Sequence, residues 1–104
     1  MATLHILRSS PTANSAFTDC LALFSPSDTL LLIDDGCYAL HSAAFAQAIK
    51  NDELKHIQVL EKHQTARGIS EINNLTAKAA TYNAIDMNGV VDLTLTHDRV
   101  VTWQ

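Results

Sequence analysis

Two cysteines, Cys20 and Cys37, are the residues of this chain that could act as nucleophiles in sulfur chemistry. A thiolate can attack another sulfur atom and hold it reversibly. Cys37 directly follows Gly36, where a strand is predicted to turn into a helix whose amino end would acidify the thiol. Cys20 lies at the border of the apolar stripe of a predicted helix, with no cationic neighbour in sequence. Each cysteine can equally be a small buried core residue.

The acidic pair Asp34 and Asp35 follows the apolar run at residues 30–33. Adjacent acids at the carboxyl edge of a parallel sheet hold magnesium in some doubly wound folds. That site also needs an acid and a lysine at the ends of other strands, and the sequence shows no such set. We therefore predict that the pair forms a turn, with Asp35 capping the helix that follows.

Other residue types give no further chemical signal. The five histidines lack metal-ligand spacing, so no metal is predicted and most of them are assigned to solvent or an interface. The three glycines are isolated, which argues against a phosphate-binding loop, and no cofactor is predicted. Ser9 and Ser10 lack the context of a nucleophilic serine, and capping of a helix is the favoured interpretation.

Length and composition favour a single domain over residues 1–104 that takes part in an assembly. The chain has 47% hydrophobic and only 17% charged residues, a composition that suits a globular fold with further surface hidden in an oligomer. Its net charge is −4 and its seven Lys and Arg are dispersed, so direct binding of nucleic acid is not expected. No apolar run is long enough for a membrane span, and the cysteine usage favours the reducing cytoplasm.

The apolar patterning predicts alternating strands and helices. Proline and serine at residues 25–27 end the first helix, and Gly68 in a left-handed conformation ends the third. For residues 70–80 we predict a loop that leads into a helix. Predicted strands cover residues 3–7, 29–33, 57–60, 82–86 and 100–103. Predicted helices cover residues 12–24, 38–50 and 88–97, and a short helical turn follows the third strand and runs through residue 66. Ser10 or Thr12 is predicted to cap the first helix, and Asn88 the last. This alternation predicts a three-layer α/β/α fold with a mostly parallel sheet of about five strands.

Several short motifs, taken in their order and spacing, resemble the TusB/DsrH family of sulfur-relay subunits. The resemblance covers most of the chain. It rests on Leu4-His5 with Ser10-Pro11, residues 31–39 as an "LLL..DG.YA" pattern, Leu60-Glu61 with Ala66-Arg67-Gly68-Ile69, and Asp86, Val91, His97 and Trp103.

The resemblance implies a small α/β subunit of a heterohexamer with TusC/DsrF-like and TusD/DsrE-like subunits. Such complexes relay persulfide sulfur through small carrier proteins, in the Tus branch toward 2-thiolation of the tRNA wobble uridine. The principal sulfur-bearing cysteine belongs to the TusD/DsrE partner, so this chain is expected to be a non-catalytic or accessory subunit. DsrH-type subunits carry a cysteine that falls at Cys20, which makes Cys20 the candidate sulfur carrier of this chain.

Two alternatives remain open from the sequence. One is a DsrH-type subunit of a sulfur-oxidation complex. The other is a stand-alone α/β ligand-binding or regulatory module that uses Asp34, Asp35 and neighbouring loops at the strand ends.

Overall fold

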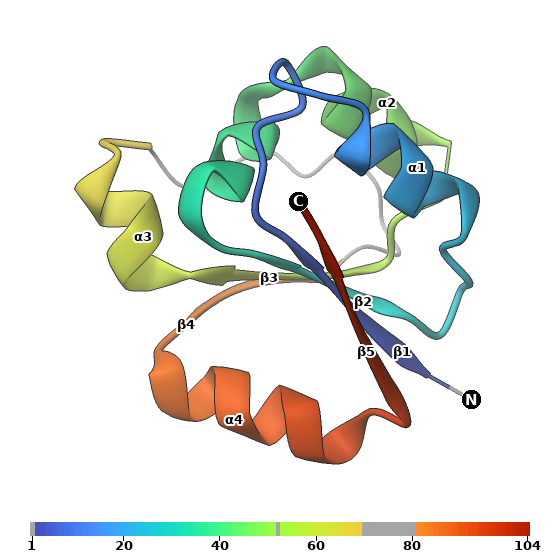
Figure 1. Cartoon of the computed structure of the whole chain (residues 1–104), viewed down its shortest axis with the longest axis vertical. Coiled ribbons are helices and arrows are strands. Elements are labelled where there is room, and N and C mark those ends of the chain that lie inside the picture. The colour runs from blue at the N-terminus through green and yellow to red at the C-terminus, as the bar shows by residue number, and fades with distance from the viewer. Residues whose placement is uncertain (1, 52, 70–80) are drawn as a thin grey trace.

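The computed structural model describes residues 2–51, 53–69 and 81–104, and the chain folds as a parallel sheet between two layers of helices (Figure 1). The strands are β1 (Thr3–Leu7), β2 (Thr29–Leu32), β3 (His56–Leu60), β4 (Thr81–Ile85) and β5 (Arg99–Trp103). The helices are α1 (Ala16–Ala22), the 3₁₀ helix η1 (Asp34–His41), α2 (Ala43–Lys50), α3 (Glu61–Ala66) and α4 (Met87–Thr96). The predicted fold class is confirmed; the segment 70–80 lies outside the described residues.

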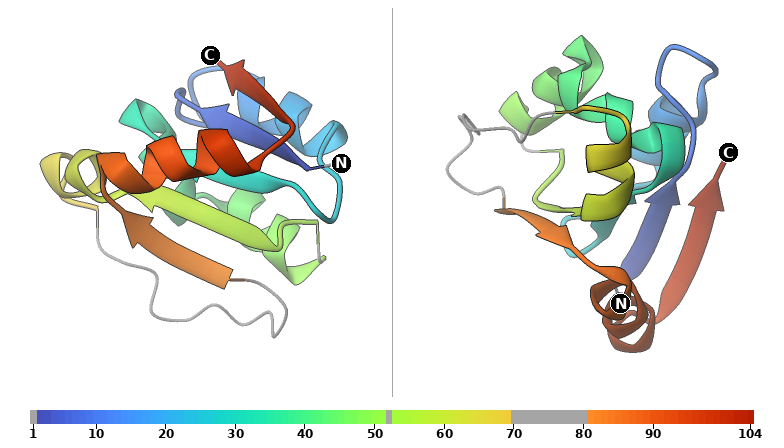
Figure 2. Two further views of the ribbon diagram at one scale, coloured as in Figure 1. Left: turned by 90° about the horizontal axis from the view of Figure 1, so that it is seen from below. Right: turned by 90° about the vertical axis from the view of Figure 1, so that its left-hand side faces the viewer.

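The five strands are all parallel, in the order β4-β3-β2-β1-β5. The helices α1, α2, α3 and η1 cover one face of the sheet, and α4 lies across the other (Figure 2). The strand β2 pairs with both β1 and β3, and Leu30, Leu31 and Leu32 are all fully buried. A strand covered on both faces needs apolar residues at every position, which explains why its sequence runs without alternation.

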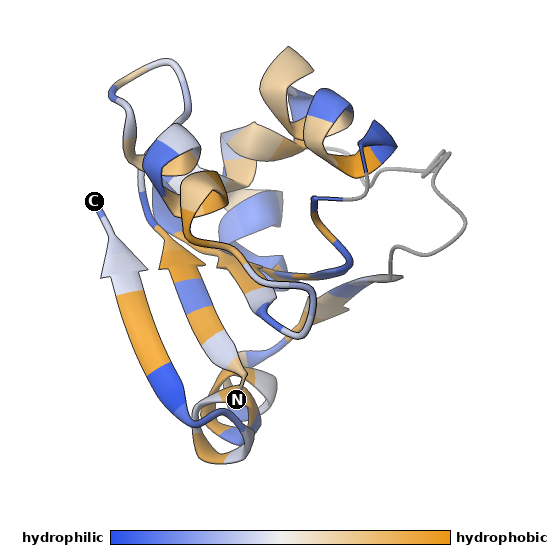
Figure 3. Ribbon diagram, turned by 90° about the vertical axis from the view of Figure 1, so that its right-hand side faces the viewer, coloured by the Kyte–Doolittle hydropathy of each residue, from blue (hydrophilic) through white to orange (hydrophobic). Residues whose placement is uncertain are grey.

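The main core lies between the sheet and the layer of α1, η1 and α2 (Figure 3). Phe17 of α1 and Phe45 of α2 are its largest buried side chains, and their ring centroids lie 6.4 Å apart. Cys20 and Cys37 both belong to this core.

The first helix is shorter than predicted because residues 10–13 form a turn. The Ala13 amide donates to the Ser10 carbonyl, and the Ser10 hydroxyl bonds to that of Thr12. Neither side chain caps the helix, so that prediction is wrong. The carboxamide oxygen of Asn14 instead accepts the Ala16 N–H at 2.9 Å.

The predicted helix over 38–50 is two helices. A 3₁₀ helix begins at Asp34, directly after β2, and an extended Ser42 separates it from α2. Ser42 caps α2 by accepting the Phe45 N–H at 3.1 Å. The capping role predicted for Asp35 is wrong, because its carboxylate binds Arg67 instead.

The fourth helix begins one residue earlier than predicted, because Asp86, rather than Asn88, is its cap. The Asp86 carboxylate accepts the Gly89 N–H at 2.9 Å. Gly68 has φ +66°, which confirms the predicted left-handed end of α3.

Candidate functional site

Cys20 lies in the core, on the buried side of α1, with no exposed surface. Burial, together with the nearby charge of Asp28, raises the pKa of the Cys20 thiol to about 12. Because the thiolate is the reactive form, this thiol is unreactive where it lies. Sulfur chemistry at Cys20 would require α1 to move away from the sheet.

Asp28 is the centre of a buried polar network at the amino end of β2. Its carboxylate accepts the backbone N–H of Thr3 at 3.0 Å, that of Ser25 at 2.9 Å and the ring Nε2 of His5 at 2.9 Å. Burial acts to raise the pKa of Asp28, but the hydrogen bonds from Ser25, Thr3 and His5 outweigh it and lower that pKa. The network therefore holds a buried, ionised carboxylate.

The tautomer of His5 follows from its two partners. The indole N–H of Trp103 can only donate, and it lies 3.1 Å from His5 Nδ1. The ring therefore accepts at Nδ1 and carries its proton on Nε2, which donates to Asp28. His5 is 3% exposed, so it is not among the histidines that lie at the surface.

A cavity of about 340 Å³ opens beside this network, between the end of α1 and β5. Its lining includes His5, Asp28, Leu23 and Trp103. Cys20 is not in the lining, although the Asp28 carboxylate acts on its thiol electrostatically. The structure thus brings Cys20 near a His–Asp pair that the sequence did not predict; the signal available was the polar Asp28 directly before an apolar strand.

Cys37 is also fully buried, and its thiol points toward the Leu32 carbonyl, with the two atoms 3.8 Å apart. Burial raises the pKa of Cys37 to about 11, although the charge of Arg67 acts in the opposite direction. Burial dominates over the backbone N–H at the start of η1, which acts to lower this pKa, so the thiol is not acidified. Its interpretation as a packing residue agrees with this environment.

The acidic pair lies at the carboxyl edge of the sheet, where each carboxylate binds an arginine. Arg8, which follows β1, donates to Asp34 at 2.9 Å, and Arg67 after α3 donates to Asp35 at 3.0 Å. The bond to Asp35 is the main reason that the pKa of Arg67 is raised. His63 lies beside them, and its Nδ1 accepts the Asp34 N–H at 2.9 Å. No feature of the sequence predicted that Arg8, Arg67 and His63 would contact this pair.

The turn that carries the acidic pair has two unusual backbone features. Asp34 has φ +49°, a left-handed conformation that few residues other than glycine adopt, and its bonds to Arg8 and His63 hold it there. Gly36 lies so close to β1 that a Cβ there would be 2.1 Å from the Leu7 carbonyl oxygen. The glycine is therefore required by the close approach of η1 to the strand.

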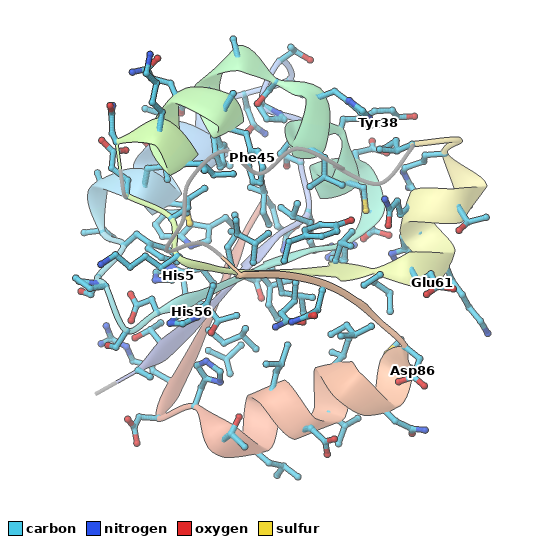
Figure 4. All side chains as sticks on the ribbon, turned by 180° about the vertical axis from the view of Figure 1, so that it is seen from behind. His5, Tyr38, Phe45, His56, Glu61 and Asp86 are labelled. Carbon is cyan, nitrogen blue, oxygen red and sulfur yellow. The ribbon has the colours of Figure 1, made fainter. Side chains whose placement is uncertain are left out.

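Cavities of about 410 and 320 Å³ flank this charged cluster. Asp35 lines the first together with Tyr38 and His41, and His63 lines the second together with Asp86. Figure 4 shows Tyr38, Glu61 and Asp86 spread along this edge. The arrangement provides a polar surface with balanced charges, and it places neither cysteine thiol at the surface.

The remaining histidines divide by exposure. His41 and His56 are exposed, as expected, whereas His97 is half-buried and bonds the Leu93 carbonyl through Nδ1 and the Thr29 hydroxyl through Nε2. Within the described residues, no group of three or more His, Cys, Asp or Glu side chains could hold a metal ion.

None of the helices in the described parts of the chain has the length and apolar character needed to traverse a membrane.

Comparison with known proteins identifies both the fold and the family. Comparison with curated proteins found no match. Among solved structures, the crystal structure of the YchN protein from E. coli superposes with a TM-score of 0.71 at 15% sequence identity, covering 99% of this chain and 100% of that one. At this identity the likeness concerns the fold. The family described as "DsrH like protein" matches residues 9–100. This match spans most of the chain and includes Cys20, Asp34 and Arg67, and the chain therefore belongs to the DsrH-like protein family.

Proposed function

We propose that this chain is an accessory subunit of a cytoplasmic sulfur-relay complex that passes persulfide sulfur toward 2-thiolation of the tRNA wobble uridine. It would assemble with TusC/DsrF-like and TusD/DsrE-like subunits in a heterohexamer. Membership of the DsrH-like family supports this proposal at the level of a sulfur-relay subunit with DsrE- and DsrF-type partners. The observation that carries the accessory role is that both thiols are fully buried.

A relay cysteine must meet a donor and then an acceptor. In each transfer, a thiolate attacks the terminal sulfur of a persulfide, a new S–S bond forms, and the donor leaves as a thiolate, with no net oxidation or reduction. Neither Cys20 nor Cys37 is placed to do this in the folded chain, because both lack exposed surface and have raised pKa values. The persulfide-bearing cysteine of the complex would then belong to the TusD/DsrE-like partner.

Cys20 is the residue of this chain that we propose as a secondary sulfur carrier. It lies on α1, a helix of seven residues held mainly by Phe17 and by Cys20 itself. Movement of so short a helix on assembly would expose the thiol and restore an ordinary pKa.

The charge of the chain supports a role in which other proteins, and not this chain, contact the RNA. The net charge is −4, and Arg8 and Arg67 are already bound to carboxylates, so the described part of the chain offers no basic surface for a phosphate backbone. Contact with tRNA would therefore run through other proteins of the relay.

A DsrH-type role in sulfur oxidation is the second candidate, and the cysteine at position 20 favours it, because the resemblance associates a cysteine there with DsrH-type subunits. The third reading, a stand-alone module binding ligands at Asp34 and Asp35, is weakened by the arginines that already occupy both carboxylates.

The test is to co-express the chain with TusC/DsrF-like and TusD/DsrE-like subunits and to supply sulfur from a cysteine desulfurase through a small carrier. We expect a stable mixed complex, with a persulfide mass shift on the partner's cysteine. Deleting this chain should then lower 2-thiouridine in tRNA. A chain that stays monomeric beside both subunits contradicts the proposal, whereas a normal complex with unchanged tRNA thiolation favours sulfur oxidation. Comparing Cys20→Ser with Cys37→Ser in the same assay tests the secondary role of Cys20.

A further inference from the structure

Three side chains tie the chain just beyond α1 to two strands of the sheet. The Asp28 carboxylate accepts the N–H of Ser25, which follows the end of α1, and also binds the Thr3 backbone and the His5 ring in β1. His5 in turn accepts the indole N–H of Trp103 in β5. We call Asp28, His5 and Trp103 the clasp.

The ring of Phe24 adds an apolar contact to the clasp. Its centroid lies 5.1 Å from that of the His5 ring, and the centroid of the Trp103 ring lies 6.1 Å from His5. Phe24 follows Cys20 by four residues, about one helical turn, and packs against the same core as Cys20. The contacts that hold the chain one turn beyond Cys20 are therefore those of the clasp.

The position of α1 depends on contacts outside the helix. A helix of seven residues is too short to be stable by itself, so its place on the sheet rests on its packing and on the clasp. Asp28 and His5 are each 3% exposed. Breaking their bonds leaves buried polar groups without partners, which costs more than breaking a bond at the surface. Movement of α1 away from the sheet must meet this cost in addition to the loss of apolar burial.

Trp103 is the member of the clasp that can be released most readily. It is half-buried, whereas the other two members are buried, and it lines the cavity of about 340 Å³ together with Leu23. The cavity gives the indole room to turn, and water there can accept its N–H in place of His5. The bonds of Asp28 have no such replacement in the buried network.

The hydrogen bonds of His5 favour a holding role over an acid–base role at Cys20. Its Nδ1 accepts from Trp103 and its Nε2 donates to Asp28. Neither nitrogen is free to take a proton from a thiol, and a general base must lie within hydrogen-bond reach of the proton that it removes.

We propose that the clasp controls the movement of α1, and therefore access to Cys20, with release of Trp103 from His5 as the first step. The proposal rests on the function proposed above, in which Cys20 is a secondary sulfur carrier. It adds which contacts decide when that thiol can be reached.

The test measures alkylation of Cys20 by iodoacetamide in the full chain on a Cys37→Ser background, so it needs neither partner subunits nor a sulfur donor. Trp103→Phe removes the indole N–H and keeps an aromatic ring beside His5. His63→Ala is the matched control, because it removes one hydrogen bond at the carboxyl edge of the sheet, away from the clasp. Urea unfolding gives the stability of each variant.

Trp103→Phe leaves the buried Nδ1 of His5 without its donor, so we expect Cys20 to react about tenfold faster than in wild type. His63→Ala should leave the Cys20 rate within about twofold of wild type although it lowers stability, because its bond stays intact when α1 moves. Phe24→Leu, which removes the ring contact and keeps both bonds of His5, should accelerate the reaction by a smaller factor and replaces Trp103→Phe if that variant does not fold.

Two results would overturn the proposal. If the clasp variant and His63→Ala both accelerate alkylation in proportion to their loss of stability, Cys20 is reached only by unfolding of the whole chain. If the clasp variant leaves the rate unchanged, the clasp does not control α1. Either result leaves the proposed function standing, whereas a chain that fails to join the complex defeats that function without changing the alkylation measurement.

Discussion

The burial of Cys20 predicts strong protection of its thiol from alkylation, which can be measured on a Cys37→Ser background. In the folded chain a pKa of about 12, against 9.0 for an ordinary thiol, reduces the thiolate fraction about a thousandfold at neutral pH. The alternative route is an opening of α1, which exposes Phe17 together with Cys20 and costs about 3 to 4 kcal/mol of apolar burial. That cost corresponds to a protection of a few hundredfold. Either route predicts that iodoacetamide reacts with the native chain at least about a hundredfold more slowly than with the urea-unfolded chain.

The pH dependence of the same reaction separates the two routes. If alkylation follows opening, the rate levels off near the ordinary thiol pKa of about 9. If the closed thiol reacts, the rate keeps rising with pH toward the folded pKa of about 12. A native rate within tenfold of the unfolded rate at pH 8 would show that the thiol is accessible, and the argument for an accessory role would then fail. Cys37, measured on a Cys20→Ser background, should also be protected, since burial raises its pKa to about 11.

Three further predictions concern stability. The pKa of Asp28 is lowered in the folded chain, so the stability that its carboxylate contributes is present above the unfolded pKa and is lost as the pH falls through the folded pKa. The Asp28→Asn variant should therefore have a free energy of unfolding, measured with urea, that is about 1 to 3 kcal/mol below wild type at pH 7, and the difference should be smaller at pH 3. In the same assay, Gly36→Ala should lower the free energy of unfolding by more than about 2 kcal/mol, because the new Cβ would overlap the Leu7 carbonyl. At Gly68 nothing lies within 4 Å of an added Cβ, so Gly68→Ala should lower it by only about 1 kcal/mol, through backbone strain at positive φ. The His63→Gln variant retains an acceptor for the Asp34 N–H and should unfold with nearly the wild-type free energy, whereas His63→Ala should lose about 1 kcal/mol of it. Equal losses in the two variants would show that this hydrogen bond does not stabilise the turn.

The parallel sheet was predictable because its signals are local. An uninterrupted apolar run at residues 30–33, bounded by Thr29 and Asp34, can be buried on both faces only as an inner strand. The helix ends were less predictable, because Ser10, Asp35 and Asn88 are all suitable caps by residue type. The actual caps, Ser42 and Asp86, were selected by where the chain leaves each strand, which the local sequence does not determine.

The polar contacts near the candidate site were not predictable, because their partners are far apart in sequence. Asp34 meets Arg8 across 26 residues and His63 across 29, and His5 meets Trp103 across 98. Only the strand order places these pairs together, and that order was not readable from the sequence. The resemblance did include Arg67 and Trp103 within its motifs, and the structure gives them a physical role as the partners of Asp35 and His5.

The placement of polar and apolar surface on this chain argues for a division of labour within the proposed complex. A sulfur carrier that serves two partners in turn needs its thiol at the surface in both encounters, and here each encounter would require α1 to open at a cost of about 3 to 4 kcal/mol. The features that need no such opening are the exposed apolar residues Met87, Val91 and Leu95 of α4 and the charged carboxyl edge at Asp34 and Asp35, which lie on different elements. A chain with two accessible surfaces and two inaccessible thiols is suited to holding other subunits in place. On this argument, assembly should survive loss of Cys20.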